Sequence, residues 1–219
     1  MTPQVLMLRL SPSKFELDLY LSEGLKKQRD SVRNIALNSS AIAAINLNFF
    51  DKKGRPLGLI ISGGKEKQGL LRGNRLLNGV FSLSKGRAQI TVEKDFRPLN
   101  PKTSLVPDIA IQSGPLLMLN TALAADHLSP RATRRSGIAL TVDSSLILFA
   151  TISRFPGAKL SQIQEMLGDP KLGITSAINL DGGTSSQLFV AKTGKLLSEI
   201  YITGGDEVPS ALLVRRKTT

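Results

Sequence analysis

The sequence predicts a single α+β domain built on a mostly antiparallel or mixed β-sheet with two or three flanking helices. The sheet is either open or closed into a barrel-like form. Short apolar runs bounded by Gly, Pro, Asn, Asp and Ser recur along the whole chain, and few segments have helical spacing. Neither an internal repeat nor a low-complexity linker divides the chain. A hydrophobic fraction of 41% is enough for a core, so we expect one domain over residues 1–219.

Strands dominate the first half of this prediction. The segment 15–21 alternates apolar and polar residues, which is typical of a half-buried strand, and Asp30 is placed to cap a short helix after it. The segment 96–107 contains three prolines and is expected to be a loop. The other apolar runs between turn residues predict strands at 5–10, 41–45, 57–61, 79–83 and 88–92.

The second half is predicted to combine strands with one well-defined helix. Residues 138–142 and 146–151 are separated by a short polar turn and predict a hairpin. Ser161 and Gln164 form a capping-box pattern at the start of a helix over 161–167. Further strands are predicted at 109–112 and 116–119, which flank a turn at 113–115, and at 198–202 and 211–214.

The chain is strongly basic, with a formal net charge of +12. Such a charge suits a phosphorylated substrate, an anionic glycan or nucleic acid, and its plain alternative is a basic solvated surface. The chain has no Trp and only two Tyr, and it lacks zinc-finger and helix-turn-helix spacing, so we predict no specific nucleic-acid partner. The basic residues are scattered, apart from local clusters at Arg131, Arg134 and Arg135 and at Arg215, Arg216 and Lys217.

The residue census excludes several kinds of site. The chain has no Cys and one His, His127, so thiolate metal sites and a His-rich two-metal centre are excluded. His127 lies in a polar stretch and is expected at the surface. We expect no cofactor and no metal ligands, with a divalent cation left open. Because residues 1–10 lack signal-peptide character and no run reaches transmembrane length, either the protein is cytoplasmic or an export signal has been removed.

Small and polar residues stand at the ends of several predicted strands, where strand propensity would favour other types. Asn46 and Asn48 carry amides that suit sugar hydroxyls or phosphate oxygens, or they belong to an Asn-rich turn. Gln112, with Ser113 and Gly114 after it, belongs to a pocket wall or to a tight turn.

The most informative stretch is 177–190, where an apolar run delivers Asp181 into a Gly-Gly turn. Gly182 and Gly183 have no side chains, so backbone N–H groups there are able to approach a ligand closely. Asp181 has four open roles: metal ligand, nucleophile, general base, or part of an Asp-Gly hairpin turn. Arg135, at a strand start, provides a planar fork for phosphate.

Four blocks, in this order along the chain, resemble the phosphodiester glycosidase family. Residues 44–51 are similar to its "A-x-N-x-G-F-F" block, with Asn48 in place of the usual Gly, and residues 112–115 match a bacterial "Q-S-G-P" block. Residues 135–139 resemble "R-x-[AG]-[IV]-G", with Ala139 for the last Gly, and 179–185 resemble "N-L-D-G-G-G-S", with Thr184 for the third Gly. The resemblance runs from residue 5 to residue 214.

The resemblance implies a hydrolase that breaks the sugar C1–O bond of a sugar-1-phosphodiester of the GlcNAc-1-phosphate type. It implies that Asp181 acts at the anomeric carbon, that Arg135 binds the phosphate, and that Asn46 completes the catalytic set. The leaving phosphate is weakly basic, which relaxes the usual need for two carboxylates. The residues that it implies for substrate binding are Asn48, Gln112, Ser113, Gly114, Asn179, Gly182, Gly183 and Ser185.

The resemblance also bears on partners and compartment. It implies a sugar-phosphate or glycan substrate, no membrane span and an extracytoplasmic location, periplasmic or secreted; the oligomeric state is left open. The departures at Asn48, Ala139 and Thr184 favour one alternative, a non-catalytic carbohydrate-binding protein of the envelope. The net charge of +12 favours another, a protein that binds anionic polymers without turnover.

Overall fold

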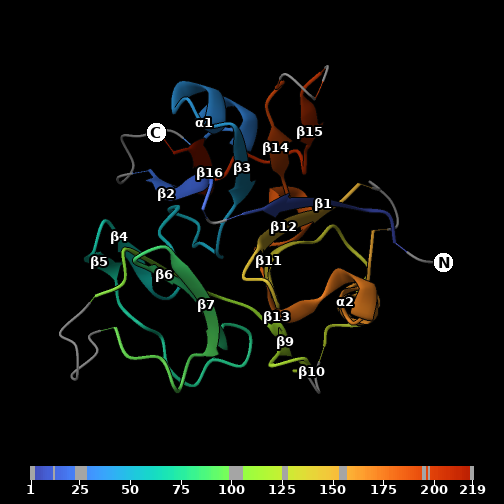
Figure 1. Cartoon of the computed structure of the whole chain (residues 1–219). Helices are drawn as coiled ribbons and strands as arrows, with labels where there is room; N and C mark the ends of the chain where they lie inside the picture. Colours follow the sequence, from blue (N-terminus) through green and yellow to red (C-terminus); the bar gives the residue numbers. More distant parts are fainter. Residues whose placement is uncertain are drawn as a thin grey trace.

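A computed structural model describes residues 3–11, 13–22, 29–98, 106–124, 128–152, 157–193, 196 and 198–217. Its strands form three antiparallel sheets around one apolar core, and two α-helices lie on the outside (Figure 1). The order of strands within each sheet differs from their order in the sequence, so the chain crosses repeatedly from one sheet to another.

The sheets are named here I, II and III. Sheet I has the order β1 (Val5–Leu10), β12 (Leu146–Thr151), β11 (Ser136–Thr141), β13 (Ile174–Asn179), β9 (Leu116–Leu119) and β10 (Ala122–Leu123). Sheet II has the order β15 (Ile200–Ile202), β14 (Leu188–Val190), β3 (Ala43–Asn46), β16 (Ser210–Arg216) and β2 (Phe15–Leu21). Sheet III has the order β5 (Lys65–Gln68), β4 (Ile60–Ser62), β8 (Ile109–Ser113), β6 (Gly79–Ser84) and β7 (Arg87–Val92).

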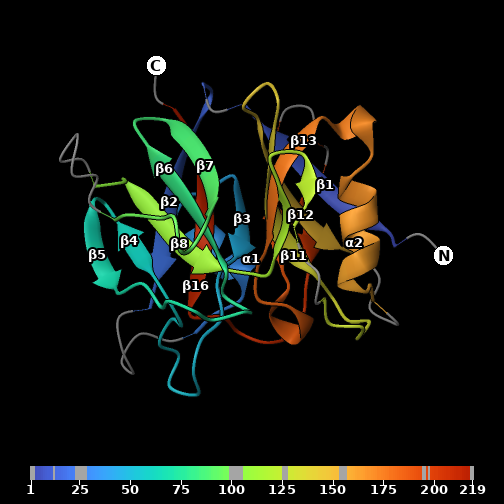
Figure 2. The ribbon, with the colours of Figure 1, turned by 90° about the horizontal axis from the view of Figure 1, so that it is seen from below.

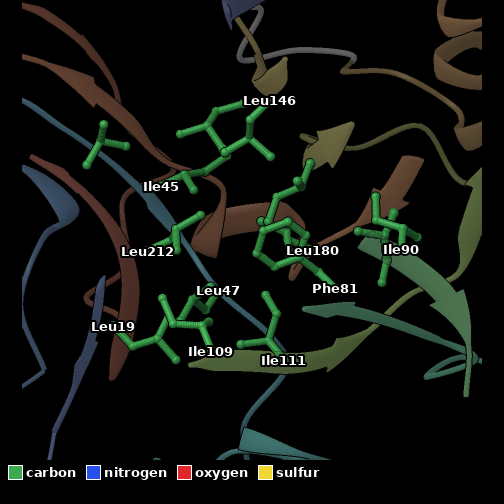
Figure 3. Packing of buried hydrophobic residues seen from close by; sticks show 14 of the residues in the cluster. Leu19, Ile45, Leu47, Phe81, Ile90, Ile109, Ile111, Leu146, Leu180 and Leu212 are labelled. Carbon is green, nitrogen blue, oxygen red and sulfur yellow. The ribbon is translucent and has the colours of Figure 1, made fainter. Parts of the chain in front are cut away.

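All three sheets contribute side chains to the central core (Figure 3). Ile45 comes from sheet II, Phe81 from sheet III and Ile138 from sheet I, and all three are fully buried. Strands β11 and β12 are buried on both faces, which explains why their sequences are continuous apolar runs. Leu180 belongs to the same core, so the residue before Asp181 is fixed by packing.

The two helices cover the outer faces of sheets I and II. Helix α1 (Val32–Asn38) packs Val32, Ile35 and Ala36 against Phe189 and its neighbours in sheet II. Helix α2 (Leu160–Leu167) packs against the outer face of sheet I (Figure 2), where Leu160, Ile163 and Leu167 share a cluster with Phe149 and Ala177. In both helices the apolar residues recur at three- and four-residue intervals, which places them on one face.

The predicted antiparallel pairing is confirmed, including the hairpin of β11 and β12. The barrel-like and mixed versions are wrong: the described strands form three separate antiparallel sheets, and the fold is mainly β with two α-helices. A barrel needs continuous pairing around the core, whereas the described strands of each sheet pair only with strands of the same sheet. Residues 113–115 are one crossover between sheets, since β8 and β9 lie in different sheets.

The predicted capping box of Ser161 and Gln164 is also wrong. The helix begins one residue earlier, at Leu160, and the Gln162 side chain accepts a hydrogen bond of 2.9 Å from the Lys159 N–H. Gln164 is buried instead and donates to the Leu117 carbonyl at 2.9 Å. The polar residue therefore ties the helix to sheet I.

Within the described residues, none of the helices has the length and apolar character needed to cross a membrane.

Candidate active site

Asp181 lies where the chain passes from sheet I to sheet II. Strand β13 ends at Asn179 in sheet I, and the next strand, β14, pairs in sheet II. The hairpin reading of Asp181-Gly182 is therefore wrong, because the strands on either side are not paired with each other. After the crossing the chain makes a single 3-10 turn, Gly183–Ser185, which Gly183 enters with φ of +65°.

Three hydrogen bonds hold the main chain of Asp181. Its N–H donates to the Leu47 carbonyl at 3.0 Å. Its carbonyl accepts from Asn46 Nδ2 at 2.8 Å and from Ser136 Oγ at 3.1 Å. Asn46 ends β3 in sheet II and Ser136 begins β11 in sheet I, so both sheets fix the position of the acid. We refer to Asn46, Leu47 and Ser136 as the Asp181 anchor.

The Asp181 carboxyl is in an environment that favours its protonated form. Burial raises the pKa of Asp181 to about 6, against hydrogen bonds from the Ser185 side chain and the Gly182 N–H that lower this pKa. The charge of Asp206 adds a smaller increase in the pKa. At pH 7 the group is mostly an ionised carboxylate and remains close enough to neutrality to exchange a proton.

A pocket of about 670 Å³ opens beside Asp181. Its lining includes the apolar residues Phe49, Leu76, Pro115 and Leu160. Three arginines, Arg131, Arg134 and Arg135, also line it. The pocket is therefore lined for a ligand that combines a negative charge with a less polar body.

Arg135 is buried in the wall of this pocket and is 7% exposed. Its Nε donates to the Ala158 carbonyl at 3.2 Å and its Nη2 to the Arg131 carbonyl at 2.7 Å. Nη1 faces the Asp181 turn, since a Cβ on Gly182 would lie 3.6 Å from it. Burial lowers the pKa of Arg135, with a further contribution from the Arg131 charge. No described carboxylate lies within 4.0 Å of this guanidinium, so its charge is available to an anion.

Asn179 also lines the pocket. Its Nδ2 donates to the carbonyls of Gly114 and Leu180, at 2.9 Å and 2.6 Å. Its Oδ1 is buried and has no hydrogen-bond partner among the described residues. A buried, unpaired amide oxygen at the edge of a pocket is suited to accept a hydrogen bond from a ligand hydroxyl or N–H.

Three of the other predicted residues, Gln112, Ser113 and Gly114, are not part of the pocket lining. The Gln112 amide makes four main-chain hydrogen bonds, to Leu59, Leu77 and twice to Leu71, which leaves it no capacity for a ligand. Ser113 is fully buried and is outside the pocket lining. Gly114 approaches Leu76 so closely that a Cβ would lie 2.1 Å from the Leu76 carbonyl oxygen.

Asn48 is also buried, at the edge of a narrow crevice that Asp181 and Ser185 share. Its Nδ2 donates to the Leu57 carbonyl at 3.2 Å, and its Oδ1 has no partner among the described residues. The structure thus brings together Asp181, Arg135, Asn46, Asn179, Gly182, Gly183 and Ser185. Asn48 lies beside this group. Gln112, Ser113 and Gly114 lie outside the pocket lining, and Gln112 holds the main chain of neighbouring segments. The ligand-binding roles of all of these residues stay predictions.

Sequence reasoning missed two features of the pocket. Arg134 lies outside the four sequence blocks, but it lines the pocket and donates to the Thr203 carbonyl. Thr184 is the residue that replaces the third Gly. Its hydroxyl donates to the Asp206 carboxylate, and its carbonyl accepts from the Asp206 N–H at 3.1 Å. The cluster of arginines was visible as a charge pattern, whereas nothing in the sequence linked Thr184 to Asp206.

The described residues contain no group of three or more His, Asp or Glu side chains placed to hold a metal ion. His127 lies outside the described residues.

Three solved structures share this fold. A hypothetical protein from Synechocystis superposes with a TM-score of 0.75 at 16% identity over 97% of this chain, which spans 59% of that protein. The catalytic domain of zebrafish N-acetylglucosamine-1-phosphodiester alpha-N-acetylglucosaminidase, auto-inhibited by its pro-peptide, gives 0.65 at 18% identity over 98% of this chain and 89% of its own. A protein from Burkholderia pseudomallei described as exported gives 0.65 at 13% identity, over 96% and 73%.

At these identities the likeness shows the fold alone, and no curated protein matches the sequence. The family model for phosphodiester glycosidases, however, matches residues 39–215, which include the Asp181 anchor and the whole pocket. The resemblance of the four sequence blocks is therefore confirmed, and the chain belongs to the phosphodiester glycosidase family.

Proposed function

We propose that the protein is a hydrolase that cleaves the sugar C1–O bond of a sugar-1-phosphodiester. The observation that carries the proposal is that one pocket contains a partly buried carboxyl group, Asp181, and a buried arginine, Arg135, with no described carboxylate within 4.0 Å of its guanidinium. The carboxylate is suited to the anomeric carbon and the guanidinium to the phosphate. Family membership supports the hydrolase class.

In this mechanism Asp181 attacks the anomeric carbon as a nucleophile, or removes a proton from an attacking water. As the new bond to C1 forms, the C1–O bond breaks and its electrons pass to the phosphate oxygen, which leaves as a phosphomonoester. Where Asp181 is the nucleophile, water then attacks C1 of the glycosyl ester, so that the sugar is released and the Asp181 carboxylate is regenerated. Arg135 stabilises the charge that grows on this phosphate. Because the leaving oxygen is weakly basic, no second carboxyl is needed to protonate it.

The surrounding residues have supporting roles in the proposal. Asn46 is a positioning residue, since its amide holds the Asp181 carbonyl and its Oδ1 accepts from the Gln187 N–H at 2.9 Å. Ser185 orients the carboxyl group. Asn179 accepts a hydrogen bond from the sugar, and Gly182 and Gly183 leave room for it.

The sugar is proposed to be N-acetylglucosamine or a close relative. The name of the zebrafish neighbour supports this sugar, and that of the exported Burkholderia neighbour supports a periplasmic or secreted location. Phe49 and Leu76 in the pocket lining provide apolar surface for the less polar face of a sugar ring or for an acetyl group.

A screen of sugar-1-phosphodiesters, with Asp181→Asn as the blank, tests this function. Hydrolysis of an active diester in 18O-labelled water is expected to place the label on the sugar, because the bond that breaks is C1–O. Mass spectrometry of the two products measures it. Label on the phosphate would instead mean attack at phosphorus and would overturn the assignment of Asp181 to the anomeric carbon.

The pH profile of kcat/KM follows from the raised pKa of Asp181. Both proposed roles require the ionised carboxylate, so activity is expected to be lost as pH falls through about 6 and to level off above it. Below that pH the rate should drop about tenfold per unit. A profile that is flat between pH 5 and 7, or that falls as pH rises there, would contradict the role of Asp181 as nucleophile or base.

A non-catalytic role in binding anionic polymers is the second candidate. The three arginines of the pocket and the net charge of +12 favour it. It predicts a salt-dependent affinity for a polyanion that Asp181→Asn leaves unchanged, together with the absence of turnover of every diester in the screen.

A further inference from the structure

We propose that Arg131 is a second phosphate-binding residue, which forms with Arg135 a two-arginine clamp for the phosphate as it leaves as a dianion. The chemical step in this proposal rests on the proposed function, but the affinity of the clamp for phosphate can be measured without turnover. Neither the sequence blocks nor the family match assigns a role to Arg131.

The position of Arg131 is set by Arg135 itself. The Arg135 Nη2 donates to the Arg131 carbonyl at 2.7 Å, and both residues line the same pocket. Their charges are close enough for that of Arg131 to lower the pKa of Arg135. Two arginines thus line one pocket and repel each other, and an anion bound by both would offset that repulsion.

The segment that carries the two arginines is held in place. Thr133 pairs with Ala158 through two main-chain hydrogen bonds of 3.1 Å and 2.8 Å. Gly157 packs so tightly there that a Cβ would lie 2.4 Å from the Thr133 carbonyl carbon. Arg131 is therefore attached to a fixed part of the pocket wall, and its exposed side chain extends from a defined point.

Arg134 does not take part in the clamp. Its Nη1 donates to the Thr203 carbonyl, which commits it to the wall formed by residues 203–206. Among the described residues, no carboxylate lies within 4.0 Å of Arg131, Arg134 or Arg135. The clamp pairs Arg131 with Arg135 because Arg131 is the arginine whose charge acts on Arg135 and whose carbonyl holds Arg135 Nη2.

The charge of the phosphate changes in the direction that two arginines would favour. A phosphodiester carries one negative charge, whereas a phosphomonoester has a second pKa near 6 and carries close to two above it. Arg135 balances the charge of the bound diester. Arg131 balances the charge that appears as the bond breaks, so it contributes more to the transition state than to the bound substrate.

The test compares the wild-type protein with Arg131→Gln, and uses Arg87→Gln as a control that removes an equal charge from an exposed position at the start of β7. Calorimetry at pH 8 measures the affinity for methyl phosphate, a dianion, and for dimethyl phosphate, a monoanion. Arg131→Gln is expected to lower the affinity for methyl phosphate by about tenfold and the affinity for dimethyl phosphate by about twofold at most. Arg131→Lys should restore part of the loss, and Arg87→Gln should change neither affinity.

In turnover of an active diester, Arg131→Gln should lower kcat by about tenfold with little change in KM. The clamp is overturned if Arg131→Gln weakens both phosphates equally or neither of them. A wild-type protein that prefers methyl phosphate in this Arg131-dependent way, yet hydrolyses no diester, would retain the clamp and refute the proposed function. If instead the wild-type protein hydrolyses diesters and Arg131→Gln changes neither phosphate affinity nor kcat, the proposed function is retained and the clamp is refuted.

Discussion

Replacing Asp181 with Asn is expected to remove turnover of a sugar-1-phosphodiester and to leave a folded protein that is more stable than the wild type above pH 6. The amide cannot attack the anomeric carbon or accept the proton of water, so a loss of at least about a thousandfold in kcat is expected. The Asp181 anchor acts on the main chain, and the substitution keeps all three of its hydrogen bonds.

The gain in stability follows from the direction of the pKa change. The pKa of Asp181 is about 6 in the folded protein, against an ordinary value of 3.8. As pH rises through this interval, the unfolded chain loses its proton first, so the free energy of unfolding of the wild type falls. The penalty is absent well below pH 4 and complete above pH 6, where it is on the order of 2 kcal/mol.

Thermal unfolding of the two proteins measures this difference. The Tm of Asp181→Asn should be close to that of the wild type well below pH 4 and exceed it at pH 7 by several degrees, about 5 °C for a chain of this size. A variant that is less stable than the wild type at pH 7 would show that the carboxylate makes favourable contacts which outweigh its burial. A variant with near-normal turnover would remove Asp181 from the mechanism.

Replacing Gln112 with Leu is expected to cause the largest loss of stability among the predicted site residues. The two side chains have similar volumes, so the change acts mainly through the four hydrogen bonds of the amide. Four main-chain groups lose their partner, two of them in fully buried bonds with Leu59 and Leu77, and the free energy of unfolding should fall by about 3–5 kcal/mol. This is roughly 10 °C in Tm.

Gln89→Leu is a matched control, because Gln89 is exposed on β7 in the same sheet. Activity of Gln112→Leu, where folded protein can be prepared, should fall because Leu76, next to Leu77, lines the pocket. A Tm within about 2 °C of the Gln89→Leu control would refute the supporting role of Gln112 and would reopen its assignment to the substrate.

Much of the secondary structure could be predicted because its signals are local. The alternation in 15–21 and the short turn between β11 and β12 are properties of a few neighbouring residues. Strand β5 was missed for the same reason, since Lys65–Gln68 is wholly polar and exposed and owes its conformation to pairing with β4. The division into three sheets depends on contacts between distant segments, which local patterns do not contain.

The candidate site divides in the same way. The order of the four sequence blocks identified Asp181 and Arg135, and the structure places both at one pocket. The hydrogen-bond partners of the amide side chains could not be predicted, because a sequence does not show whether an Asn or Gln binds a ligand or a distant main-chain carbonyl. Gln112 is saturated by segments 35 to 53 residues away, and Asn46 reaches Asp181 across 135 residues.

The Asp181 anchor separates what places the acid from what selects its substrate. The acid is held by the ends of strands in two sheets, whereas the pocket wall is made mainly by loops at 129–135 and around Gly204. Changes in those loops can alter the size and charge of the accepted group without moving the carboxylate. This fold can therefore evolve new substrate preferences. Relatives of low sequence identity can keep one position for the acid while the chemistry of the surrounding loops diverges.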